Sequence, residues 1–152
     1  MSIAIGQVVD GKYRIVRLLG QGAMGAVFEG ENTRIKRRVA IKVLHAAVAA
    51  KKDLVDRFER EAQAAGRIGS EHIVDILDLG ELPDGARYLV MEYLEGESLG
   101  DRIKSSVRIP PALLLPMVRQ LLVGLGAAHQ AGIVHRDLKP DNVYLAKEVA
   151  GH

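Results

Sequence analysis

A short stretch near the end of the sequence, HRDLKPDN at residues 135–142, carries a high density of side chains that could do chemistry. Asp137 offers a carboxylate for a substrate hydroxyl, Lys139 a cation for a phosphate in transfer, and Asn142 a carbonyl oxygen for Mg²⁺. This order suits phosphoryl transfer, which depends on positioning and on neutralising negative charge. An ordinary charged surface loop is the alternative that this stretch leaves open by itself.

A glycine-rich stretch, GQGAMGAV at residues 20–27, fits the pattern G-x-G-x-x-G-x-V. Glycine lets the backbone approach a phosphate closely and turn its N–H groups toward it. The stretch is not a dinucleotide-binding fingerprint, because that motif lies between a strand and a helix, whereas a strand follows here. Alone, the pattern more often marks a plain glycine-rich hairpin, so it gains weight only in combination with other motifs.

Lys42 in the segment VAIK shares its strand face with Ala40, a small residue that leaves room for a flat ligand. Further along the chain, Glu61 lies on the apolar stripe of a helix predicted over residues 53–68. An uncompensated buried charge is strongly destabilising, so we expect an ion pair between Lys42 and Glu61. A solvated lysine is the alternative. The stripe consists of Leu54, Phe58, Ala65 and Ile68.

The elements that must position these residues begin with strands. Alternating segments predict five of them, and the first two form a hairpin around the glycine-rich turn. In the third, Val39 and Ile41 point to one face and Lys42 to the other. A turn at residues 83–85, Pro-Asp-Gly, joins the last two. The predicted strands cover residues 13–20, 26–32, 37–44, 72–80 and 86–94.

Helices dominate after residue 97, which predicts an α+β protein with two lobes. A short helix at residues 98–104 has Ser98 as its predicted cap. A long helix at residues 111–131 begins with prolines and ends at Gly132. Pro116 lies deep enough in this helix to allow a kink.

The composition excludes some classes of function. Lys plus Arg is 21 and Asp plus Glu is 19, and this formal charge of +2 is too small to indicate nucleic-acid binding. The basic run RIKRR at residues 34–38 is better explained as a solvated hairpin than as a site for a phosphate backbone. Cysteine is absent, which excludes disulfides and thiolate chemistry.

The most apolar window covers residues 112–128 and is shorter than the ~20 residues of a membrane span. Pro116, Arg119 and Gln120 interrupt it, so we expect a buried helix and no membrane segment. The first residues lack the basic and apolar regions of a signal peptide. We therefore expect a cytoplasmic location.

Taken together, the motifs resemble the protein kinase family, and in particular its bacterial Ser/Thr members. GQGAMGAV, VAIK, the helical glutamate, VMEYL and HRDLKPDN occur in the family's order, from about Tyr13 to Leu145. The resemblance implies a protein-kinase-like α+β fold. It has a five-stranded antiparallel N-lobe with one main helix over residues 13–95, and the first, helical part of a C-lobe over residues 96–152.

The resemblance also implies residue roles and the cofactors ATP and Mg²⁺. Asp137 would accept or orient the proton of a Ser or Thr hydroxyl on a protein substrate, Lys139 would stabilise the γ-phosphate, and Asn142 would bind Mg²⁺. Lys42 would hold the α- and β-phosphates and pair with Glu61. The remaining implied nucleotide-binding residues are Leu19, Gly20, Gly22, Gly25, Val27, Ala40, Met91, Glu92, Leu94 and Tyr144.

The sequence departs from the family pattern after the catalytic loop. No D-F-G or A-P-E motif follows Asn142, so we expect a C-terminally incomplete catalytic domain that is weakly active or inactive alone. A non-catalytic nucleotide- or partner-binding module is the alternative, and a homodimer is compatible with either interpretation. Arg136 and Lys139 favour protein substrates over small molecules.

Overall fold

The computed structural model describes residues 3–148 of the 152-residue chain. It divides into two compact units. The first unit comprises residues 3–66 together with Val74–Tyr93, and the second comprises Arg67–Ile73 together with residues 94–148. Each unit has its own sheet, and the two are described separately.

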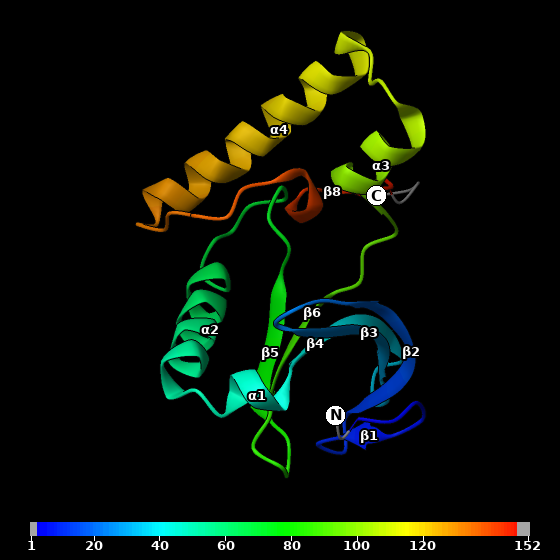
Figure 1. Cartoon of the computed structure of the whole chain (residues 1–152), viewed down its shortest axis with the longest axis vertical. Helices are drawn as coiled ribbons and strands as arrows, with labels where there is room; N and C mark the ends of the chain where they lie inside the picture. The colour runs from blue at the N-terminus through cyan, green and yellow to red at the C-terminus, as the bar shows by residue number, and fades with distance from the viewer. Residues whose placement is uncertain (1–2, 149–152) are drawn as a thin grey trace. The chain divides into compact units, whose positions relative to one another are not determined.

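The first unit is built on an antiparallel sheet of six strands in the order β1-β2-β3-β4-β6-β5 (Figure 1). All five predicted strands are present, although the fourth begins later than expected. The additional strand, β1, is a two-residue edge strand that was not predicted. The strands are β1 (Val8–Val9), β2 (Tyr13–Gln21), β3 (Gly25–Asn32), β4 (Arg37–Leu44), β5 (Ile76–Glu81) and β6 (Arg87–Glu92).

One face of this sheet forms the hydrophobic core. The alternation predicted for β4 is confirmed, because Val39, Ile41 and Val43 are each at most 1% exposed. Side chains from neighbouring strands join them, among them Phe28 of β3 and Val90 of β6. Burial of these apolar groups stabilises the sheet.

Two helices complete the first unit: α1 (Ala46–Ala49) and α2 (Lys52–Ala65), and α2 lies alongside β5 (Figure 1). The predicted helix is confirmed, and its predicted apolar stripe is partly buried, because Ile68 just beyond α2 is buried and Leu54, Phe58 and Ala65 are half-buried. The placement of Glu61 on the buried side is wrong. Val55 and Ala62 are the buried residues, while Glu61 is exposed. Successive residues are about 100° apart around a helix, so a shift of one position turns Glu61 away from the core.

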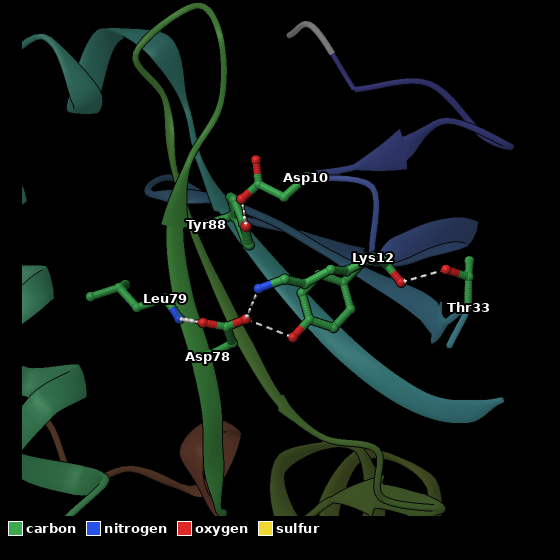
Figure 2. A network of polar contacts seen from close by, with 7 residues as sticks. Asp10, Lys12, Thr33, Asp78, Leu79 and Tyr88 are labelled. Atoms are coloured by element: carbon green, nitrogen blue, oxygen red, sulfur yellow. Dashed lines mark hydrogen bonds and ion pairs between the residues drawn. The ribbon is translucent and has the colours of Figure 1, made fainter. Parts of the chain in front are cut away.

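A polar network ties the turn before β2 to strands β5 and β6 (Figure 2). The Tyr13 hydroxyl donates to Asp78 Oδ2 at 2.7 Å, Lys12 Nζ lies 3.6 Å from the same oxygen, and the Tyr88 hydroxyl donates to Asp10. Burial raises the pKa of Asp78, but the hydrogen bond from Tyr13 and the other donors outweigh it and lower that pKa overall. Burial, followed by the adjacent carboxylates, raises the pKa values of Tyr13 and Tyr88.

The second unit combines a two-stranded sheet with helices. Its elements are β7 (Gly96–Ser98), α3 (Leu99–Ser106), α4 (Pro111–Gln130), the 3₁₀ turn η1 (Pro140–Asn142) and β8 (Tyr144–Ala146). The predicted cap of α3 is confirmed, because Ser98 Oγ accepts a hydrogen bond from the Asp101 N–H at 3.0 Å. Helix α4 continues through Pro116, and Gly132 follows its end with φ of +78°.

The prediction that the long apolar helix is buried is wrong for the described residues, because only Gly124 and Ala128 of α4 are buried. These small residues lie one turn apart, and a Cβ added at Gly124 would come within 3.1 Å of the His72 carbonyl oxygen. Much of the rest of the helix surface is exposed, including Leu115 and Leu122. By length and composition α4 could also cross a membrane, but this is weak evidence, since core helices of soluble proteins pass the same test.

Candidate active site

The loop that follows α4 is shaped by its own backbone. Arg136 has a positive φ of +64°, which turns the chain sharply just before Asp137. Three residues later, Pro140 begins η1, where the Asn142 N–H donates to the Lys139 carbonyl oxygen at 2.9 Å. The polar residues of HRDLKPDN are thereby folded back on one another.

The predicted catalytic residues lie together in this loop. Asn142 Nδ2 donates to the Asp137 backbone oxygen at 2.8 Å and to Asp137 Oδ2 at 3.2 Å. Lys139 Nζ lies 3.7 Å from the same Asp137 Oδ2. All three side chains are exposed, so the carboxylate is oriented by neighbours and remains accessible to a substrate. The arrangement places a proton acceptor, a cation and an amide oxygen within one turn of chain.

Contacts with β7 and α3 of the second unit fix the position of this loop. The Leu99 N–H donates to the Val143 carbonyl oxygen at 2.7 Å, and β8 pairs with β7. Gly100 of α3 allows Asp141 to approach closely, because a Cβ at position 100 would lie 2.0 Å from the Asp141 carboxylate. Tyr144 donates its hydroxyl to the Leu94 carbonyl oxygen at 3.2 Å.

In the first unit, the glycine-rich stretch forms the turn between β2 and β3. Its three glycines have different surroundings. A Cβ at Gly25 would lie 2.0 Å from the Val43 carbonyl oxygen, whereas a Cβ at Gly20 or Gly22 would meet nothing within 4 Å. Gly25 is thus required by the adjacent strand, while Gly20 and Gly22 leave open space beside the backbone, as a site for a bulky phosphate group needs.

His45, which no sequence motif predicted, contacts this turn directly. Its Nε2 lies 2.8 Å from the Gly22 carbonyl oxygen, and its backbone N–H donates to the Met24 carbonyl oxygen at 2.9 Å. These two bonds tether the glycine-rich turn to the end of β4. No sequence pattern indicated this role, because a single histidine after a strand has no distinctive spacing.

The register of the sheet places four of the predicted nucleotide-binding residues on the face opposite the core. Val27 of β3 pairs with Lys42 of β4, and Ala40 pairs with Met91 of β6. Paired residues in an antiparallel sheet project to the same side, so these side chains share one surface. Leu19, on β2, is 40% exposed.

The predicted ion pair between Lys42 and Glu61 is not formed. Glu61 instead accepts a hydrogen bond from Arg57 Nε at 2.8 Å, one turn earlier on α2, and its side chain is 64% exposed. Lys42 makes none of the ion pairs found among residues 3–148. The phase of α2 explains the difference, because the carboxylate that faces the sheet is Glu59, which accepts from Arg87 Nε at 2.8 Å.

Two hydrogen bonds between Glu92 and Asp75 fix the end of β6. The Glu92 N–H donates to the Asp75 carbonyl oxygen at 3.0 Å, and Glu92 Oε1 accepts from the Asp75 N–H at 2.9 Å. Glu92 therefore has its backbone N–H and its side chain engaged with the segment before β5. The backbone at this position is held firmly at the edge of the predicted nucleotide-binding face.

The donor set of the catalytic loop fits Mg²⁺ in part. Asn142 uses its amide nitrogen on Asp137, which leaves its Oδ1 oxygen as a hard ligand of the kind Mg²⁺ prefers. Among residues 3–148 there is no group of three or more acidic or histidine side chains that could hold a metal ion. Mg²⁺ commonly binds through one or two protein oxygens plus substrate phosphates, so Asn142 suits that mode.

Comparison with known proteins agrees with these features. A family model described as the protein kinase domain matches residues 13–150. The serine/threonine-protein kinase pkn2 of Myxococcus xanthus is 46% identical over 144 residues, covering 95% of this chain and 17% of pkn2. The serine/threonine-protein kinase PrkC of Bacillus subtilis is 40% identical over 141 residues, covering 93% of this chain and 22% of PrkC.

A similar match is found among solved structures. The PknI kinase domain of Mycobacterium tuberculosis matches with a TM-score of 0.83 and 34% identity, covering 96% of this chain and 60% of that chain. The chain thus spans 60% of the PknI domain and 17% to 22% of the two curated relatives.

Proposed function

Because the chain belongs to the protein kinase family, we propose that it forms the ATP-binding and catalytic-loop part of a serine/threonine protein kinase. The proposed reaction transfers the γ-phosphoryl group of ATP to a Ser or Thr hydroxyl of a protein substrate. The observation that carries the proposal is that Asn142 Nδ2 donates to the Asp137 backbone oxygen and to Asp137 Oδ2, which orients the carboxylate beside Lys139. A cytoplasmic location is part of the proposal, since ATP is the substrate.

The residues of the second unit have distinct roles in this reaction. Asp137 accepts the proton of the substrate hydroxyl while the hydroxyl oxygen bonds to the γ-phosphorus and the bond to the β–γ bridging oxygen breaks, releasing ADP. Lys139, 3.7 Å from the Asp137 carboxylate, stabilises negative charge on the γ-phosphoryl oxygens. Asn142 keeps the carboxylate oriented and offers Oδ1 to Mg²⁺. When bound, Mg²⁺ neutralises phosphate charge.

The first unit contributes nucleotide binding. The turn containing Gly20 and Gly22 brings backbone N–H groups to the phosphates, and the side chain of Lys42 supplies a cation. An apolar surface for the base is formed by Leu19, Val27, Ala40 and Met91. The backbone carbonyl of Glu92 accepts a hydrogen bond from the edge of the base. Leu94 and Tyr144, which the family resemblance also assigns to the base, remain predictions.

Mg-ATP binding is measured on the chain by titration calorimetry. Because the chain spans only 60% of the PknI kinase domain, phosphate transfer from labelled ATP to a Ser/Thr peptide mixture is measured on the chain joined to the remaining part of a related kinase domain. Asp137→Asn should abolish transfer while leaving binding intact, because Asp137 acts on the hydroxyl. Lys42→Ala should weaken binding. Asp56→Asn, which alters an exposed carboxylate on α2, is the matched control and should change neither. Transfer that survives Asp137→Asn would contradict the proposed role.

A non-catalytic nucleotide-binding module is the second candidate, and one observation favours it. Protein kinases need the ion pair between the strand lysine and the helix glutamate for activity, yet Glu61 is paired with Arg57. This candidate predicts that Mg-ATP binds and that no transfer occurs with any Ser/Thr peptide. The same two assays therefore separate the candidates, since the kinase requires both signals.

A further inference from the structure

Glu29 is a buried charged residue on the nucleotide-binding face of the sheet, and no motif accounts for it. It is 7% exposed, and its strand position places it two residues after Val27 on the same face of β3. A carboxylate in such a place is stable only if it is paired and hydrogen-bonded. Two arginines supply the partners: Arg17 Nε lies 2.6 Å from Oε2, and Arg38 Nε lies 3.1 Å from Oε1.

Both arginines then converge on one aromatic residue. Arg17 Nη2 donates to the Tyr93 hydroxyl at 3.3 Å, and Arg38 Cζ lies 4.0 Å from the centroid of the Tyr93 ring. The guanidinium group is planar, so fixing its Nε–H on Glu29 also fixes the direction of the rest of the group. Tyr93 is consequently held at its hydroxyl by one arginine and across its ring by the other.

The position of this cluster connects it to the base-binding edge. Glu29 pairs with Ala40, and Ala40 pairs with Met91, so the cluster adjoins the apolar surface proposed for the base. Tyr93 directly follows Glu92, whose N–H is already bonded to Asp75. The end of β6 is therefore fixed by hydrogen bonds between Asp75 and the backbone and side chain of Glu92, and by the contacts of the Tyr93 side chain with the two arginines.

We propose that Glu29 is a positioning residue that acts through Arg17 and Arg38 on Tyr93 and thereby fixes the Glu92 carbonyl that meets the base. The inference rests on the proposed nucleotide-binding function and deepens it. It assigns the cluster to recognition of the adenine edge and not to binding of the phosphates. Glu29 touches no nucleotide itself.

The electrostatics agree with a permanently charged anchor. Burial raises the pKa of Glu29, but hydrogen bonds and charge from Arg17 and Arg38 outweigh burial and lower it overall. The hydrogen bond to Glu29 raises the pKa of Arg17. At neutral pH Glu29 and Arg17 are thus both ionised, so the pairing between them does not depend on protonation there.

The test compares two probes on the full chain: Mg-ATP, and inorganic tripolyphosphate with Mg²⁺, which has no base. Glu29→Gln should raise the Kd for Mg-ATP by about three- to tenfold, the loss that one misplaced hydrogen bond produces. It should leave the Kd for tripolyphosphate unchanged. Glu81→Gln, another glutamate that pairs with an arginine in the same unit, is the matched control and should affect neither probe.

A double-mutant cycle separates positioning from simple stabilisation. If Glu29 acts through Tyr93, then Glu29→Gln should add no further loss of ATP affinity in a Tyr93→Leu background. If Glu29→Gln folds poorly, Arg17→Ala replaces it in the cycle, because the Arg17 side chain is 59% exposed and its removal should disturb folding less. The same loss of ATP affinity is then measured. Equal losses for both probes, or additive losses in the cycle, would overturn the inference. A wild-type chain that binds tripolyphosphate but not Mg-ATP would overturn the nucleotide proposal as well.

Discussion

Replacing Gly25 with alanine should destabilise the protein, whereas the same change at Gly22 should not. Both glycines belong to the glycine-rich stretch that is proposed to bind phosphate. If function alone required them, alanine at either position should leave the stability of the fold equally unaffected. The structure distinguishes them. A new Cβ at Gly25 would lie 2.0 Å from the Val43 carbonyl oxygen, 2.9 Å from the Val43 carbonyl carbon and 3.1 Å from Leu44 Cα. At Gly22 a Cβ would have no heavy atom within 4 Å.

The expected magnitudes follow from these surroundings. All three atoms near Gly25 belong to the backbone of β4, so the strand itself must shift, and such overpacking costs about 1–3 kcal/mol. For a chain of 152 residues each kcal/mol moves Tm by about 2–4 °C, which gives a decrease of about 2–12 °C. Gly22 has no positive φ, so alanine there should stabilise by about 0.4–1 kcal/mol through the unfolded state.

Thermal unfolding of the wild type and the two variants, with and without Mg-ATP, measures both consequences. Gly22→Ala should keep or raise Tm and lose most of the ATP-induced increase in Tm, because the new methyl group occupies space beside the phosphate-binding backbone. Gly20→Ala, at an equally open position of the same turn, should behave like Gly22→Ala. The reasoning fails if Gly25→Ala unfolds at the wild-type Tm, or if Gly22→Ala lowers Tm as much as Gly25→Ala does.

Three further predictions concern contacts outside the motif. Arg57→Ala removes the exposed partner of Glu61 and should lower the free energy of unfolding by only about 0.3–0.5 kcal/mol, measured by urea denaturation. Asp78→Asn should flatten the acid limb of the stability–pH profile. Its pKa is lower in the folded state, so its stabilisation is complete above about 3.9, the unfolded pKa, and is lost as pH falls through the folded pKa. His45→Ala frees the glycine-rich turn and should raise the Kd for Mg-ATP about two- to fivefold with little change in Tm.

The parts of the fold and site that could be predicted from sequence depend on local interactions. The catalytic-loop residues fold together because Asn142 reaches Asp137 only five positions away, and Ser98 caps α3 from three positions away. Strand alternation identified the core side of β4 for the same reason, because odd-numbered residues such as Val39 and Ile41 face the core and even-numbered residues such as Lys42 face the other side. Short spacing makes such contacts visible in the sequence itself.

The features that the sequence did not predict depend on partners that are distant in the chain. Glu29 occupies an ordinary strand position, and the sequence around it does not indicate that it is buried. Its partners, Arg17 and Arg38, lie on the neighbouring strands. The contact between Arg17 and Tyr93 spans 76 positions. The placement of Glu61 on the buried side of α2 was wrong for a related reason, because residues 53–68 allow two adjacent phases and only packing against β5 and β6 selects one.

The ion pair between Glu59 and Arg87, and not the one between Arg57 and Glu61, sets the rotation of α2 about its axis. The Arg57–Glu61 pair is more than 60% exposed on both sides and contributes about 0.3–0.5 kcal/mol, too little to keep Glu61 from Lys42. Glu59 and Arg87 are about one-third and one-quarter exposed, and they join the helix to the sheet at 2.8 Å. Because partly buried pairs are less screened by solvent, this contact dominates. Any event that brings Glu61 to Lys42 must therefore rearrange Glu59 and Arg87.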